Sequence, residues 1–79
     1  MALNRLGKYE HAIECSDNIL RLDNGNIHAL NNKGFALGRM GRYDEAIECC
    51  NIVLTTKSDD KDTLELIKWI NEEYNKIKN

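Results

Sequence analysis

The central part of the chain carries two runs of apolar residues at helical spacing. Within each run an apolar residue or glycine recurs every three or four positions, which places the run on one face of an α-helix. The first run consists of Ile27, Leu30, Gly34, Leu37 and Met40. The second run consists of Tyr43, Ala46, Ile47, Cys50, Val53 and Leu54. The pattern predicts two amphipathic helices in succession.

Polar residues and a glycine mark the ends of these helices. Asn26 precedes the first run and is a good N-cap, and Gly41 follows it as a good C′ residue. Asp44 and Glu45 lie in the first turn of the second helix, where the helix dipole favours negative charge. The connection is so short that the two helices are expected to form an antiparallel hairpin. Gly34 is expected to let the two backbones approach closely, opposite Ala46.

A third apolar stripe predicts a helix over the last segment of the chain. Asp60 or Ser58 can cap its start, and Lys76 and Lys78 suit the negative end of its dipole. The stripe consists of Leu64, Ile67, Ile70, Tyr74 and Ile77.

The chain repeats itself with a period of 34 residues. Residues 6–20 read LGKYEHAIECSDNIL and residues 40–54 read MGRYDEAIECCNIVL. From Ala2 to Leu20, ten of nineteen residues are identical to the residue 34 positions later. The unit is helix, glycine turn, helix. The first copy lacks about eight residues of its first helix, so we expect a short remnant, a turn at Gly7 and a helix from Tyr9 to about Leu22. The expected result is apolar surface left partly uncovered at Ile13, Ile19 and Leu20.

The period and its motifs resemble the tetratricopeptide repeat family. Leu30, Gly34 and Leu37 occupy the family's helix A positions, and residues 41–47 read GRYDEAI, close to the family's G-x-Y-D-E-A-I. Lys33 stands where a leucine is usual. The resemblance implies an all-α fold, a right-handed superhelical stack of antiparallel helix hairpins with a C-terminal capping helix. It implies one domain over residues 1–79, with a clipped repeat at 1–26, a complete repeat at 27–60 and a capping helix at 61–79.

The resemblance also implies a concave groove lined by the first helix of each unit. Its expected partner-binding residues are Asn4, Arg5, His28, Asn31, Asn32, Phe35, Arg39, Glu65 and Trp69. Asparagine amides can bind a peptide backbone, arginines can bind a carboxylate, and Phe35 offers an apolar anchor. Trp69 can anchor a partner or cover an edge of the core, and edge cover is favoured. Only Asn32 fits the family's clamp for chaperone tails, so such a tail is not predicted.

Composition narrows the function further. The 79 residues carry a net charge of −2 with both signs interspersed, which argues against nucleic acid as a partner. The sequence has no apolar run of the length that spans a membrane and no signal-peptide pattern. Three cysteines, an odd count, indicate reduced thiols and a cytoplasmic location.

The sequence offers little chemistry. His11 and Cys15 share a helix face, but two ligands do not make a structural zinc site, so no metal, cofactor or catalytic residues are predicted. Cys49 and Cys50 are interpreted as packing residues. The sequence therefore favours a protein–protein interaction module that takes a protein or peptide partner. The alternative is a self-assembling repeat protein, whose uncovered helix face mediates homo-oligomerisation or helix swapping.

Overall fold

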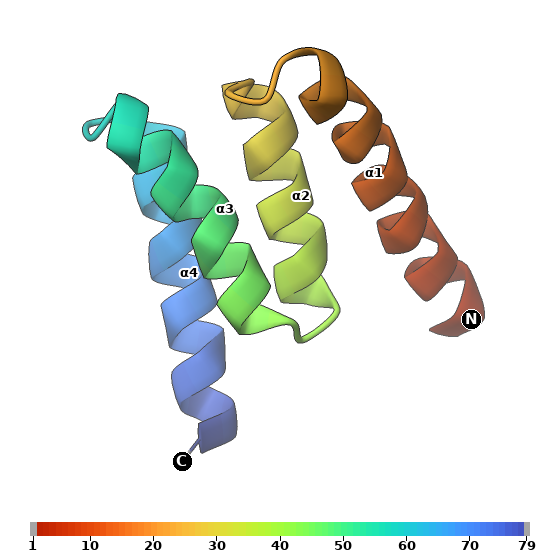
Figure 1. Cartoon of the computed structure of the whole chain (residues 1–79). Coiled ribbons are helices and arrows are strands. Elements are labelled where there is room, and N and C mark those ends of the chain that lie inside the picture. The colour runs from red at the N-terminus through yellow and green to blue at the C-terminus, as the bar shows by residue number, and fades with distance from the viewer. Residues whose placement is uncertain (1, 79) are drawn as a thin grey trace.

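Four α-helices make up the part of the chain that the structure, a computed structural model, describes: the backbone of residues 2–78 and the side chains of residues 7–77. The helices are α1 (Ala2–Leu22), α2 (Ile27–Arg39), α3 (Tyr43–Thr56) and α4 (Lys61–Lys78). Each runs antiparallel to the one before it, and α4 lies behind α3 in Figure 1. Helix α2 packs against all three others, whereas α1 packs against α2 alone. None of the described helices has the length and apolar character needed to span a membrane.

The hairpin of α2 and α3 turns at Gly41, as the sequence predicts. Gly41 has a φ of +83° and is the only described residue with a positive φ. The Arg42 N–H donates to the Leu37 carbonyl at 2.9 Å and the Gly41 N–H donates to the Gly38 carbonyl at 3.2 Å. These two bonds form a Schellman motif, in which a left-handed residue satisfies the last carbonyls of the helix. Glycine at this position therefore directs α3 back along α2.

The hydrophobic core lies between α2, α3 and α4. None of the fully buried apolar residues of this core comes from α1. Ile13 and Leu20 of α1 are partly buried and pack against the edge of the core. The buried members are Leu30, Leu37, Ala46, Cys49, Cys50, Val53 and Ile70. The predicted stripes of α2 and α3 thus account for most of the core. Cys49 is the addition that the stripe of α3 does not include.

The expected turn at Gly7 is wrong. Helix α1 continues through Gly7, and residues 2–6 extend it at its N-terminal end. A glycine inside a helix costs only about 1 kcal/mol relative to alanine. A turn here would break the helical backbone hydrogen bonds that continue through Gly7. The same Gly-x-Tyr motif therefore bends the chain at Gly41 but not at Gly7.

The predicted stripe of α4 is also partly wrong. Leu64 and Ile77 remain 43% and 68% exposed. The face that packs on the rest of the molecule keeps Ile67 and Ile70 of the predicted stripe. It adds Thr63, Leu66 and Trp69, which the stripe did not include. Leu64 stands 34 residues after Leu30, which is buried, but among the described residues no helix covers the corresponding side of α4. Part of the apolar stripe of α4 is therefore exposed and does not pack on the core.

Helices α2 and α4 begin with equivalent caps. The Asn26 side-chain oxygen accepts from the Ala29 N–H at 2.9 Å, and the Asp60 carboxylate accepts from the Thr63 N–H at 3.1 Å. Each cap satisfies a backbone donor that has no partner within its helix. The Thr63 hydroxyl also donates to Asp60, at 2.6 Å. The hydroxyl and backbone bonds from Thr63 lower the pKa of the Asp60 carboxyl.

The two equivalent glycines are expected to respond oppositely to alanine. Gly41→Ala places a Cβ in a left-handed conformation and should lower stability by about 1–2 kcal/mol. Gly7→Ala should raise stability by up to about 1 kcal/mol, because Gly7 is helical and a Cβ added there would meet no atom within 4 Å. Urea and thermal unfolding of both variants measure the difference. A loss of stability in Gly7→Ala comparable to that of Gly41→Ala would contradict a continuous α1.

Protonation of Asp60 is expected to destabilise the fold in acid. Because the pKa of this carboxyl is lower in the folded protein, its stabilising contribution is complete above about pH 4 and is lost as the pH falls through the folded-state pKa. Asp60→Asn should therefore lower Tm at pH 7 by roughly 4 °C. The gap between wild type and variant should narrow as the pH falls below the ordinary pKa of an aspartate and Asp60 becomes protonated in the folded protein. Melting curves from pH 7 to pH 2.5 test this, with Asp59→Asn at the exposed neighbouring carboxylate as control.

Candidate functional site

An open groove of about 310 Å³ runs between α2 and α4. Its apolar wall is formed by Phe35 and Trp69, whose rings stack with centroids 5.4 Å apart. Phe35 is 47% exposed, so a large aromatic face is available to a partner. The groove is lined by Phe35, Asp62, Glu65, Leu66 and Trp69. This α2–α4 groove thus combines an aromatic wall with two carboxylates from α4.

Trp69 owes its position to Gly38. A Cβ at residue 38 would lie 2.8 Å from Trp69 Cζ3 and 3.5 Å from Ile70 Cγ1, so any side chain there would collide with the indole ring. The space left by the missing side chain of Gly38 is filled by Trp69. The indole packs against the core on one side and lines the groove on the other.

Asn31 is held by contacts within the protein. Its Oδ1 atom lies 2.9 Å from Thr63 Oγ1, which also lies 2.6 Å from Asp60 Oδ2. The Thr63 hydroxyl donates chiefly to the carboxylate, because that acceptor is charged and nearer. Thr63 is fully buried and Asn31 is half-buried. Asn31 therefore joins α2 to the start of α4, which sequence spacing alone does not reveal.

The remaining predicted site residues do not gather in the α2–α4 groove. The Arg39 Nε donates to the Tyr9 hydroxyl at 3.1 Å, so the guanidinium lies toward α1. Asn32 lines a different groove, between α1 and α2, and His28 is exposed near the start of α2. The side chains of Asn4 and Arg5 lie outside the described residues. Of the nine predicted residues, the structure brings Phe35, Glu65 and Trp69 together in the α2–α4 groove.

Two lining residues of the α2–α4 groove, Asp62 and Leu66, were not predicted from sequence. Asp62 is three residues before Glu65 and Leu66 is three before Trp69, so both share their helix face. This spacing could have identified Asp62 and Leu66 as groove residues from the sequence, once Glu65 and Trp69 were chosen.

The second groove, between α1 and α2, is of similar size, about 350 Å³. Most of its surface is apolar, and Ile19 at its edge is 46% exposed. Its lining consists of Lys8, Tyr9, Ala12, Cys15, Ser16, Ile19, Asn32, Phe35 and Ala36. Phe35 therefore borders both grooves. The sequence predicted uncovered apolar surface on this helix but not the α1–α2 groove itself.

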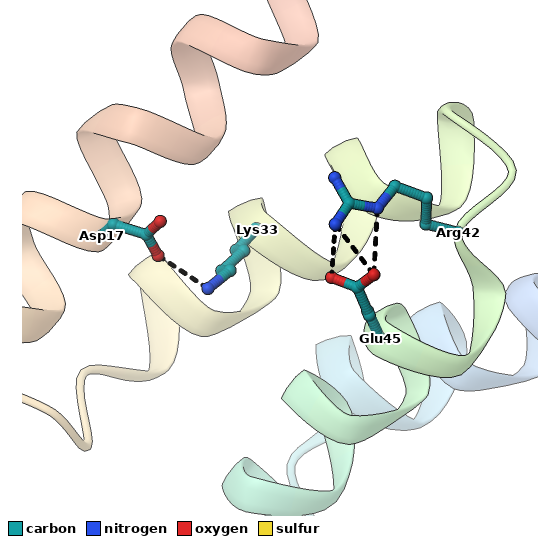
Figure 2. A network of polar contacts seen from close by, with 4 residues as sticks. All are labelled: Asp17, Lys33, Arg42 and Glu45. Carbon is teal, nitrogen blue, oxygen red and sulfur yellow. Dashed lines mark hydrogen bonds and ion pairs between the residues drawn. The ribbon is translucent and has the colours of Figure 1, made fainter.

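Two ion pairs lie on another part of the surface, one between helices α1 and α2 and one at the start of α3 (Figure 2). Lys33 Nζ lies 2.6 Å from Asp17 Oδ1 and joins α2 to α1. The hydrogen bond with Asp17 raises the pKa of Lys33. Arg42 makes a bidentate pair with Glu45, with contacts of 2.8 Å from Nη2 to both carboxylate oxygens. The lysine that departs from the usual leucine thus has an ionic partner on the neighbouring helix.

The cysteines are free thiols in two different environments. Cys15 is exposed and its Sγ lies 3.6 Å from His11 Nε2, whereas Cys49 and Cys50 are buried. Burial raises the pKa of Cys49, and it raises the pKa of Cys50 to about 11. Within the described residues, no three His, Cys, Asp or Glu side chains are grouped so that they could hold a metal ion.

Comparison with known proteins identifies the repeat. Residues 27–60 match the family model of the tetratricopeptide repeat. The matched segment contains α2, the Gly41 turn and α3, and it ends at the Asp60 cap of α4. No curated protein and no solved structure matches the chain. Residues 27–60, folded as a helical hairpin, are therefore a tetratricopeptide repeat.

Proposed function

We propose that this chain binds a protein or peptide partner in the α2–α4 groove and carries out no reaction of its own. Tetratricopeptide repeats are in general helical modules for protein–protein interaction, which supports the general class. The exposed Phe35 ring stacked on Trp69 is the observation that carries the proposal for this groove. Aromatic side chains of this kind, fixed by packing and open on one face, are typical anchors in protein interfaces.

The charges around the groove suggest the chemistry of the partner. Asp62 and Glu65 stand beside the two aromatic rings, and both carboxylates are exposed. A partner segment that places an apolar side chain against Phe35 and a lysine or arginine beside Glu65 would satisfy both features. A carboxylate partner for Arg39, expected from the sequence, has less support, because Arg39 is bonded to Tyr9.

The proposed layout keeps one domain with three parts. We propose a clipped repeat at residues 1–26, a complete repeat at residues 27–60 and a capping helix at residues 61–79. The many polar residues on the outer face of α4 are compatible with a capping role. Three free thiols are compatible with the cytoplasmic location inferred from the sequence.

Homo-oligomerisation is the second candidate function. It is favoured by α1, which packs against α2 alone and leaves Ile19 and Leu22 exposed. Light scattering over a range of concentrations would detect it as a rise in mass.

Selection from a peptide library tests the groove. Peptides that bind the full chain are expected to pair an aromatic or aliphatic residue with a nearby lysine or arginine. Glu65→Lys should weaken the selected peptides by roughly five- to tenfold, since an attraction at the groove becomes a repulsion. Glu48→Lys is the matched control, because it changes the net charge equally on α3, away from this groove.

Binding affinities from fluorescence anisotropy decide the outcome. Equal losses in Glu65→Lys and Glu48→Lys would mean that peptides respond only to total charge, and the proposed groove would be wrong. Selected peptides without basic residues would exclude the carboxylate contribution.

A further inference from the structure

The α1–α2 groove corresponds, through the 34-residue repeat, to a surface between α3 and α4. Helix α2 covers that second surface. Adding 34 to each residue that lines the α1–α2 groove gives a set on α3 and α4. The residues Tyr9, Ala12, Ser16 and Ile19 become Tyr43, Ala46, Cys50 and Val53. The residues Asn32, Phe35 and Ala36 become Leu66, Trp69 and Ile70. Nearly all of these counterparts belong to the core or pack against it.

The element that covers this second set is α2. A Cβ on Gly34 would lie 3.3 Å from Leu66 Cδ2, 3.4 Å from the Ala46 carbonyl oxygen and 3.5 Å from Cys49 Cβ. A Cβ on Gly38 would meet Trp69 and Ile70. Leu30 and Leu37, on either side of Gly34, belong to the same buried cluster. Helix α2 therefore shows what kind of ligand such a groove accepts: a helix with large, small and large residues at i, i+4 and i+7.

The α1–α2 groove differs from its occupied counterpart in two ways. Ala36 stands in place of Ile70 and Phe35 in place of Trp69, so there is more room opposite the position of Gly38. Arg39 stands in place of Glu73. The hydrogen bond to Tyr9 is the main cause that raises the pKa of Arg39, and the Glu73 carboxylate on α4 adds a smaller contribution in the same direction. A helix in the α1–α2 groove would instead meet Arg39 at this point.

Orientation follows from the same correspondence. Helix α2 runs antiparallel to α3 (Figure 1). A helix in the equivalent place therefore runs antiparallel to α1, and its C-terminus lies beside Lys8 and Tyr9. Arg39 donates a hydrogen bond to Tyr9 at this end of the groove. The C-terminus of a docked helix would therefore lie near two cations, Arg39 and Lys8. A helix C-terminus carries partial negative charge, and an acidic residue in its last turn would add a direct pair.

From this geometry we infer that the α1–α2 groove binds an amphipathic helix of a partner protein, with the apolar spacing of α2 and an acidic residue at the position of Arg39. A second copy's own α2 is disfavoured as the occupant, because it would place arginine against Arg39 and Lys8. The site is distinct from the α2–α4 groove, although Phe35 borders both.

Synthetic peptides of the chain's own α2, residues 26–41, serve as probes of the full chain. One has the natural sequence and the other carries Arg39→Glu. Titrations are followed by ¹H–¹⁵N chemical shifts of the labelled chain. The Glu peptide should move the resonances of Tyr9, Ala12, Ser16 and Ile19 saturably, and it should bind about threefold or more tightly than the natural peptide at low salt. A Gly38→Ala version should bind at least as well, because Ala36 leaves room, although the same change inside the chain collides with Trp69.

Two chain variants make the test specific. Ala12→Leu fills the groove and should abolish binding, while Ile52→Ser, at an exposed position on α3, should leave it unchanged. Lys8→Glu should reduce the difference in affinity between the two peptides, and this reduction does not depend on whether Ala12→Leu folds normally.

The inference fails if the chemical-shift changes appear outside the groove, if neither peptide binds, or if Lys8→Glu leaves the difference in affinity between the peptides unchanged. It also fails if sedimentation shows a dimer that Ala12→Leu abolishes and the peptides do not displace, because a second copy would then cover the groove. Failure here would leave the α2–α4 groove untested by these probes, since Glu65 and Asp62 are unchanged in every variant.

Discussion

The fold depends on how closely α2 approaches α3 and α4. Gly34 lets the α2 backbone lie against Ala46 of α3, and Gly38 lets it lie against the indole of Trp69. Each glycine weakens the isolated helix by about 1 kcal/mol, so packing must provide the compensation. Because α2 is the helix that contacts all the others, any loss of this approach would separate α3 and α4 from α1 at once.

The sequence predicted the complete repeat well because its determinants are local. An N-cap at Asn26, a left-handed turn at Gly41 and two helical stripes are each set by residues within a few positions of one another. Gly7 and Leu64 were misjudged because their behaviour depends on neighbours. The motif around Gly7 is nearly that of Gly41, but residues 2–6 continue α1 in line and do not form a separate helix that packs against it. Leu64 has the apolar character of Leu30 without a helix to cover it.

The candidate site was predicted less well, for a related reason. Helix periodicity places Phe35 and Trp69 on their helices, but it does not say that the two rings meet across α2 and α4. It also cannot show that Asn31 is held by Thr63 or Arg39 by Tyr9. The positions at which the repeats differ were more informative than they first appeared. Asp17 and Lys33 both depart from their counterparts, Asn51 and Ile67, and the structure joins them in one ion pair across α1 and α2 (Figure 2).

The different environments of the three thiols have a practical consequence. Cys49 and Cys50 are buried, and burial disfavours their thiolates, which are the forms that react with alkylating reagents. Cys15 is exposed and lines the α1–α2 groove. The unaltered chain thus carries its own attachment point for a spin label or fluorophore, at the place where a docked helix would change the mobility of the dye.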